Sequence, residues 1–284
     1  MIVFRTQSEM RQWSHSRAGE SASIGFVPTM GALHEGHMQL LALSQSENDM
    51  TVLSIFVNPT QFNNSEDFDK YPRTMDADLV LAKSAGVDVV YAPTASLMYP
   101  EGFDTSIDPG FISRSMEGEF RPGHFEGVST VVVKLLNAVL PDRLYLGQKD
   151  FQQLAVLRHV VKDLDMAVAV VGAPTVRHED GLAMSSRNVR LTSAHREAAP
   201  IIYGALTAAQ LAFQNGERSA TMLRDTVLEI LRSEEECRIE YVSIVNASSL
   251  QPMDELSGAV VICVAVQFGD VRLIDNIQLE EQSR

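Results

Sequence analysis

The chain has 284 residues, 45% of them hydrophobic, and a formal net charge of −14 at pH 7. That length suits one large domain or two modest ones, and the charge argues against binding to a nucleic-acid backbone. Two cysteines are too few for a disulfide framework and fit a reducing compartment. The apolar runs at 1–5 and 259–266 are too short for a secretory signal and a membrane span, respectively. We therefore expect a cytoplasmic protein with no nucleic-acid and no membrane partner.

Strand-like and helix-like patterns alternate through the first two thirds of the chain. Strands are predicted at 23–27, 50–57, 87–91, 144–146 and 167–171, and helices from residue 37 onward and at 76–85, 128–140 and 151–164. This alternation is typical of an α/β fold with a parallel sheet and helices on both faces. Ligands bind such sheets at the carboxyl ends of the strands, so polar segments that follow strands are candidate sites.

The pattern changes beyond residue 176. Helices are predicted at 193–215 and 220–233, and strands, more consistent with antiparallel pairing, at 238–245, 259–268 and 271–273. We therefore expect a larger domain at 1–176 and a smaller α+β domain at 177–284.

The segment His34-Glu35-Gly36-His37 follows the first predicted strand and a loop with Pro28 and Gly31. The two histidines are three residues apart, so they can share one helical face. Free backbone N–H groups and the positive end of the helix dipole favour an anion there, which indicates a phosphate site.

Two other interpretations of this histidine pair remain open. A His-x-x-His pair can bind zinc, although Cys237 and Cys263 are distant and do not offer an evident third ligand. The pair can also simply cap the helix or lie on the surface.

Two further polar segments precede the middle of the chain. Asn58-Pro59-Thr60-Gln61 closes the second predicted strand, and its amides suit a small ligand with hydroxyl groups or form an ordinary Asn-Pro turn. Arg121, in a loop with Pro122 and Gly123, can neutralise an anion or stay in solvent.

Two more polar segments follow the later strands. Lys149 falls where a helix begins, and a cation there opposes the helix dipole, which favours a phosphate partner. Asp150 can cap that helix or bind ribose hydroxyls. The segment Ser185-Ser186-Arg187 offers several donors to one anion, or caps the next helix.

Together these segments resemble the nucleotidyl-transfer site of the superfamily that contains the class I aminoacyl-tRNA synthetases, whose HIGH-type and Lys-Met-Ser-Lys-Ser motifs grip ATP. The resemblance narrows to the pantothenate synthetase family and extends from about residue 3 to about residue 278. The motifs that carry it are 28–37, 56–62, 71–74, 121–125, 147–153 and 185–188. Leu146 and the stretch Asp76-Ala77-Asp78 depart from the family pattern.

The resemblance implies a Rossmann-like doubly wound sheet, a smaller α+β C-terminal domain that carries the Ser-Ser-Arg loop, and a homodimer. It also implies ligation of pantoate to β-alanine with ATP as a substrate and Mg²⁺ as cofactor, through a pantoyl adenylate. The implied catalytic residues are His34, His37, Lys149, Ser185, Ser186 and Arg187. Those implied to bind ATP are Met30, His34, His37, Gly147, Lys149, Asp150, Val176, Met184, Ser185, Ser186 and Arg187. The residues implied to bind pantoate or β-alanine are Asn58, Gln61, Arg121 and Gln153. No metal ligand is assigned.

Two alternatives remain. Another nucleotidyltransferase of the superfamily would share the histidines but has no evident need for both Gln61 and Gln153. A non-catalytic nucleotide-binding protein would have little use for His34, His37, Lys149 and Arg187 together.

Overall fold

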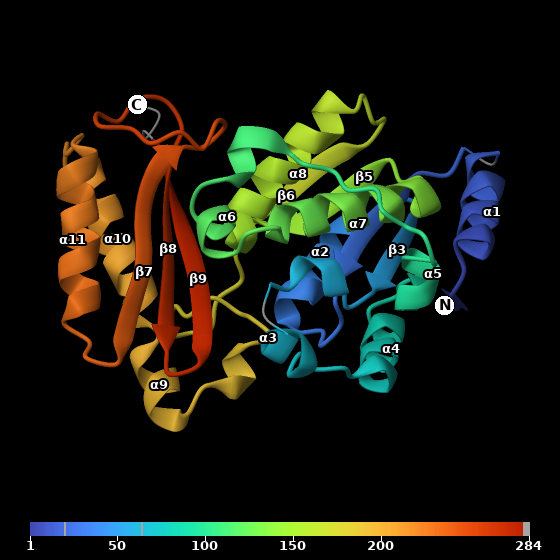
Figure 1. Cartoon of the computed structure of the whole chain (residues 1–284), viewed down its shortest axis with the longest axis horizontal. Coiled ribbons are helices and arrows are strands. Elements are labelled where there is room, and N and C mark those ends of the chain that lie inside the picture. Colours follow the sequence, from blue (N-terminus) through green and yellow to red (C-terminus); the bar gives the residue numbers. More distant parts are fainter. Residues whose placement is uncertain (20, 64, 281–284) are drawn as a thin grey trace. The chain divides into compact units, whose positions relative to one another are not determined.

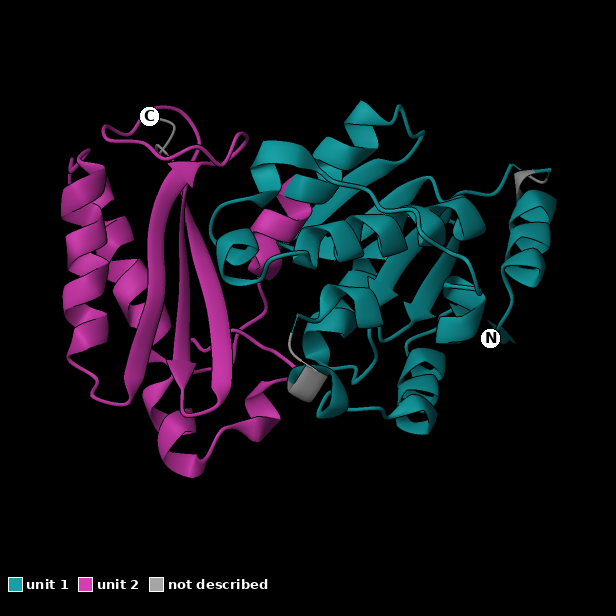
Figure 2. Cartoon of the chain, viewed as in Figure 1, with its two compact units in different colours: residues 1–148, 156–174 teal, residues 149–155, 175–284 magenta. Residues whose placement is uncertain are grey.

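The structure is a computed structural model that describes residues 1–19, 21–63 and 65–280 (Figure 1). The chain divides into two compact units, coloured teal and magenta in Figure 2. Unit 1 comprises Met1–Gln148 and Val156–Pro174, and unit 2 comprises Lys149–Ala155 and Thr175–Arg284. The short segment 149–155 belongs with unit 2, where the Asn276 side-chain amide donates to the Lys149 carbonyl oxygen (2.8 Å).

Unit 1 is built on a six-stranded sheet in the order β1-β4-β3-β2-β5-β6, in which every neighbouring pair is parallel. The strands are β1 (Ile2–Phe4), β2 (Ile24–Thr29), β3 (Met50–Ile55), β4 (Val89–Tyr91), β5 (Arg143–Gly147) and β6 (Ala169–Ala173). The order reverses between β2 and β5, the position at which doubly wound sheets bind ligands. The predicted Rossmann-like fold is confirmed.

Helices cover both faces of this sheet (Figure 1). They are α1 (Gln7–Ala18), α2 (Glu35–Glu47), α3 (Ser65–Asp69), α4 (Met75–Ser84), α5 (Ala95–Met98), α6 (Glu117–Phe120), α7 (His124–Val139) and α8 (Phe151–Asp163). On one face, Leu41 of α2 and Ala82 of α4 join the cluster formed by Val27, Leu53 and Val90 of the strands. These strand residues are fully buried, which explains why the strands are continuous apolar runs.

Unit 2 contains an antiparallel sheet in the order β7-β8-β9, as the sequence predicts for this part of the chain. Its strands are β7 (Cys237–Asn246), β8 (Val260–Phe268) and β9 (Val271–Leu279), and its helices are α9 (Ser193–Ala198), α10 (Ile201–Gln214) and α11 (Ala220–Arg232). Leu206 of α10 and Leu223 and Val227 of α11 pack with Ile262 and Val264 of β8 in one buried core.

Several elements differ from the sequence-based expectation. The strand β1 and the helix α1 were not predicted, and the stretch 93–123, whose sequence indicates mainly loops, contains the short helices α5 and α6. The predicted helix 193–215 is broken into α9 and α10 at Pro200, because proline has no N–H to continue the helical ladder. The strand β9 extends to Leu279, well beyond the predicted end at residue 273.

None of the helices in the described part of the chain combines the length and the apolar character that a membrane crossing requires.

Candidate active site

The loop after β2 leads into α2, and His34 is the N-cap residue of that helix. Its Nδ1 accepts a hydrogen bond from the Gly36 N–H (3.2 Å), while the His34 N–H donates to Nδ1 of His37 (3.2 Å). The two rings lie side by side, with centroids 4.1 Å apart. The histidines therefore form a reciprocal cap, the imidazole counterpart of a Ser-x-x-Glu capping box.

This cap fixes the tautomer of both rings. Because each Nδ1 accepts a hydrogen bond from a backbone N–H, the proton of each neutral ring is on Nε2. Capping and phosphate binding are thus compatible, since capping engages the Nδ1 atoms and each neutral ring then carries its proton on Nε2.

The backbone of this loop differs from the sequence-based expectation of free N–H groups. The N–H groups of residues 31–34 and 36–38 all donate within unit 1, to Thr29, Asp78, His37 or His34. The expectation of free N–H groups was wrong for these positions. The sequence does not reveal which side-chain and carbonyl atoms accept hydrogen bonds from these N–H groups. Contact with an anion here depends on the imidazoles.

Burial, and then the neighbouring His34 ring, lower the pKa of His37 to about 3. His37 is therefore a neutral hydrogen-bond donor near pH 7, and in the free protein it does not carry the extra proton that a general acid would transfer. The zinc interpretation has no support, because no group of three or more potential His, Cys, Asp or Glu ligands occurs among the residues that the structure describes.

Asn58 and Gln61 meet at the turn that follows β3. The Asn58 side-chain amide donates to Oε1 of Gln61 (3.1 Å) and to the Gly127 carbonyl (3.1 Å), and its Oδ1 accepts from the Tyr99 hydroxyl (2.6 Å). These contacts occupy Asn58, which is 1% exposed, and they orient Gln61. The Nε2 of Gln61 then faces Sδ of Met30 (3.2 Å), so Gln61 presents an amide donor beside the loop that follows β2.

The start of α7 packs closely against this turn. A Cβ at Gly127 would lie 2.5 Å from the Thr60 carbonyl oxygen, so only glycine permits this approach. The His124 Nδ1 donates to the Gln61 carbonyl oxygen (2.8 Å), because a carbonyl can only accept, and this leaves Nε2 as acceptor for Arg121 (3.2 Å).

Arg121 is largely buried, and its guanidinium also lies 3.6 Å from the Glu117 carboxylate. The sequence suggested that Arg121 neutralises a substrate anion. In the structure, Glu117 is a counterion of Arg121. The Arg121 guanidinium also donates to Nε2 of His124 and to the Gln61 carbonyl oxygen (3.4 Å). This arrangement favours a role in holding Gln61 in place.

Further site candidates belong to the segment after β5. Gly147 is the last residue of β5, which pairs with β2 in unit 1. Lys149 and Asp150 lie in a single 3₁₀ turn directly before α8, and Gln153 lies in the first turn of α8, half-buried. The placement of Lys149 at a helix start agrees with the prediction.

In unit 2, a tight hairpin carries the remaining candidates. Arg177 pairs with Ala183 in an antiparallel bridge, and the Met184 N–H donates to the Val176 carbonyl oxygen (2.9 Å), which brings together two residues implied to bind ATP. The segment that follows turns sharply, since the Arg187 N–H donates to Oγ of Ser185 (3.3 Å).

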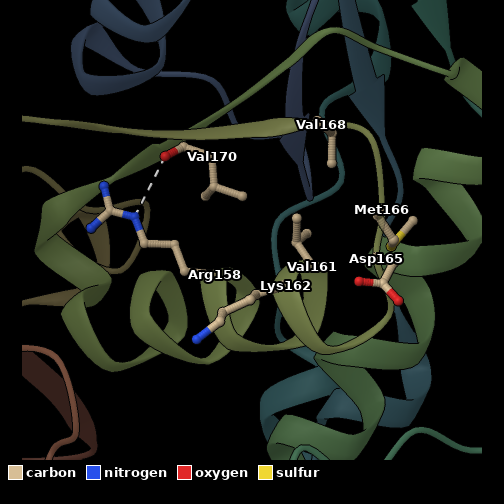
Figure 3. Close-up of a pocket in the computed structure, with 7 residues that line it drawn as sticks. All are labelled: Arg158, Val161, Lys162, Asp165, Met166, Val168 and Val170. Atoms are coloured by element: carbon tan, nitrogen blue, oxygen red, sulfur yellow. Dashed lines mark hydrogen bonds between the residues drawn. The ribbon is translucent and has the colours of Figure 1, made fainter.

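An open depression of about 440 Å³ lies elsewhere in unit 1, between the end of α8 and the start of β6 (Figure 3). Arg158 and Lys162 line it together with apolar residues, and Arg158 Nε donates to the Val170 carbonyl oxygen (3.4 Å). Since β6 begins here, the depression is at the amino ends of the strands, opposite the edge at which such sheets bind ligands. None of the predicted site residues lines it.

Some residues that shape the site carried no signal in the sequence. Asp78 lies in the acidic stretch 76–78 and His124 in the motif 121–125, and nothing in the sequence marks Glu117, Arg177 or Asp275. Most of these side chains contact the backbone or a distant partner, and such contacts follow from the fold.

Comparison with known proteins agrees with this geometry. The Pantoate-beta-alanine ligase family model matches residues 2–278. A protein of Acetivibrio thermocellus called pantothenate synthetase is 48% identical over 99% of this chain and 100% of its own length. The crystal structure of pantothenate synthetase from Thermus thermophilus is similar, with a TM-score of 0.92 and 43% identity over 98% of this chain and 99% of that one.

A third similar protein is the pantoate-beta-alanine ligase of Francisella tularensis, whose crystal structure is a complex with beta-gamma ATP and beta-alanine. It has a TM-score of 0.81 and 37% identity, over 98% of this chain and 97% of that one. Because the family model and these relatives cover nearly the whole chain, this chain belongs to the pantoate-beta-alanine ligase family.

Proposed function

We propose that the protein ligates pantoate to β-alanine at the expense of ATP, with AMP and pyrophosphate as the other products. The observation that carries the proposal is the reciprocal cap of His34 and His37 at the start of α2, which engages the Nδ1 atom of each ring and so places the proton of each neutral ring on Nε2. Family membership and the Francisella tularensis complex support the same reaction.

The reaction proceeds in two steps. A carboxylate oxygen of pantoate attacks the α-phosphorus of ATP, forms a P–O bond and expels pyrophosphate. The unprotonated amine of β-alanine then attacks the acyl carbon of the pantoyl adenylate, AMP leaves, and the amine proton passes to solvent. Neither step needs a nucleophile from the protein, so the enzyme contributes orientation and charge stabilisation.

The residues proposed to bind ATP act on different parts of the molecule. His34 and His37 donate to phosphate oxygens, and Lys149 stabilises the negative charge that moves onto the leaving pyrophosphate. Ser185, Ser186 and Arg187 bind the terminal phosphates, and closure of their loop protects the adenylate from water. The backbone around Val176 and Met184 binds adenine, Gly147 and Asp150 contact the ribose, and Met30 lies beside the phosphates.

Pantoate binds to Gln61 and Gln153. The structure favours Gln61 because Asn58 already holds its Oε1, so that Nε2 is presented as a donor. A neutral amide also suits the chemistry, since a tight arginine pair would reduce the nucleophilicity of the attacking carboxylate. We assign Asn58 and Arg121 to the support of Gln61.

Mg²⁺ would bind together with the phosphates of ATP, and we assign it no ligand among the described residues. The ion, when bound, neutralises charge on the phosphates. We also propose a cytoplasmic homodimer; the cytoplasmic location suits the buried cysteines Cys237 and Cys263, neither of which forms a disulfide. Analytical ultracentrifugation would test the dimer.

An AMP-release assay with each substrate omitted in turn tests the proposed function. AMP should form at full rate only when ATP, pantoate and β-alanine are all present. A nucleotidyltransferase of another specificity would instead yield a dinucleotide-like adduct, and a non-catalytic binding protein would yield no AMP.

A further inference from the structure

The carboxylate of Asp78 is buried beneath the loop that leads to His34. Asp78 belongs to α4 and is only 2% exposed. Its Oδ1 accepts from the Leu33 N–H (2.8 Å), and its Oδ2 accepts from the Ala32 N–H (3.0 Å) and the Thr74 hydroxyl (3.1 Å). Three donors thus compensate for the burial of this charge, and two of them belong to the loop.

The loop has an unusual backbone at this point. Gly31 and Ala32 both have positive φ, +82° and +50°, which is a costly conformation for alanine. A Cβ at residue 31 would lie 2.9 Å from Oδ2 of Asp78, so the carboxylate and the loop backbone are in close contact. An alanine in this conformation needs a compensating interaction, and the hydrogen bond to Asp78 provides one.

Asp78 and the histidine cap hold adjacent parts of the same segment. Asp78 binds the N–H groups of residues 32 and 33, and the next N–H, that of His34, donates to His37. A shift of the loop would therefore change the position of the His34 backbone, and with it the direction of both imidazoles.

We propose that Asp78 is a positioning residue for adenylate formation, which fixes the loop at residues 31–34 so that the two Nε2 atoms are aimed at the phosphates of ATP. This inference rests on the proposed function. Asp78 acts through the loop in this proposal, since its oxygens accept hydrogen bonds from the Ala32 and Leu33 N–H groups and the Thr74 hydroxyl. Catalysis by prearranged donors depends steeply on their geometry, because a displacement of about 1 Å costs on the order of 10²-fold in rate.

Asp78→Asn tests the proposal, with Asp76→Asn as the matched control. Asparagine has the same shape but keeps only one acceptor oxygen, so its amino group meets a loop N–H or the Thr74 hydroxyl. Asp76 lies in the same first turn of α4 but is exposed, and its replacement changes the helix charge equally. Thr74→Val, which removes only the hydroxyl contact, provides a milder second variant.

The measurement is pantoate-dependent exchange of labelled pyrophosphate into ATP, at a temperature at which each variant is folded. Asp78→Asn should lower the exchange kcat by about 10- to 100-fold, the size of effect that loss of an outer hydrogen-bond partner has at metal sites. The KM for pantoate should change by less than about threefold, because Gln61 is held by Asn58 and not by Asp78. Asp76→Asn should have the exchange kcat of the wild type. Thr74→Val should have an exchange kcat between those of Asp78→Asn and the wild type.

The imidazole ¹⁵N resonances provide a readout that a purely structural role would not move. In Asp78→Asn, and not in Asp76→Asn, the signals of His34 and His37 should shift or broaden. A folded Asp78→Asn variant with wild-type exchange and unchanged imidazole signals would overturn the proposal. So would a loss that excess Mg²⁺ restores, which would assign Asp78 a direct role at the metal. If the wild type itself shows no pantoate-dependent exchange, the proposed function fails instead.

Discussion

Arg177 and Asp275 form a two-pronged ion pair in unit 2, with the guanidinium nitrogens 2.6 and 2.9 Å from the two carboxylate oxygens. The guanidinium also lies over the Tyr203 ring, 3.9 Å from its centroid, and donates to the Gly181 carbonyl oxygen (3.1 Å). Since Arg177 and Gly181 belong to the hairpin that precedes Ser185, this pair ties the proposed phosphate loop to the strand β9.

Arg177→Ala should therefore be strongly destabilising. Asp275 is 4% exposed, and the substitution would leave its charge buried without its partner, which costs about 3–5 kcal/mol. The exposed pair of Arg190 and Asp270 is the control, since breaking a surface pair costs about 0–1 kcal/mol. Urea unfolding measures the loss of unfolding free energy when each pair is broken. Equal losses for the two pairs would contradict this interpretation of Arg177.

Protonation of His37 should couple stability to pH. The folded pKa of about 3 lies below the value of 6.5 for an unperturbed histidine, so between these values only the unfolded chain binds the proton. Stability conferred by the neutral ring is fully present above pH 6.5 and is lost as the pH falls toward 3, by up to about 1.4 kcal/mol per pH unit. His37→Gln removes this contribution, so unfolding free energies measured between pH 7 and pH 5 should fall less in the variant.

The same histidine can be observed directly. The imidazole ¹⁵N signals should report a neutral ring with the proton on Nε2 throughout the range from pH 5 to pH 8. A His37 ring that titrates near pH 6.5 in the free protein would show that the burial and the cap described for it are wrong.

Gln61→Ala should raise the KM for pantoate by about 5- to 150-fold, the equivalent of roughly 1–3 kcal/mol, with little change in the KM for ATP. Gln61→Glu should impair pantoate binding further, because it removes the donor and places a like charge near the substrate carboxylate. Steady-state kinetics with each substrate varied in turn would measure this. Equal losses for ATP and pantoate would indicate a structural role for the turn after β3.

Lys149→Ala should reduce the rate of adenylate formation by about 10²–10³-fold, because the proposed contact strengthens as charge moves onto pyrophosphate. The fold should be preserved, since a cation before the start of α8 opposes the helix dipole. Lys162→Ala is a suitable control, because Lys162 lies in the last turn of the same helix. A Lys149 variant that melts several degrees lower yet forms adenylate normally would make Lys149 a packing residue.

The sequence predicted the parallel sheet and the placement of His34 and His37 at a helix start because both depend on local patterns. Apolar runs mark the buried strands, and the glycines and proline mark the loop before α2. The sequence could not predict that Asp78 would accept hydrogen bonds from the loop N–H groups, since residues about 45 positions apart meet there. The contacts of His37 with His34, and of Arg121 with Glu117 and His124, join residues only three or four positions apart, but which side-chain rotamers make them was visible only in the structure.

The central claim is that pantoate becomes activated as an acyl adenylate before β-alanine reacts. Pantoate labelled with ¹⁸O in its carboxylate, incubated with ATP, Mg²⁺ and β-alanine, tests this claim most directly, because the attacking oxygen stays on phosphorus when the acyl group leaves. The account predicts one ¹⁸O atom in each AMP released and none in pyrophosphate. Unlabelled AMP accompanied by full formation of pantothenate would contradict it.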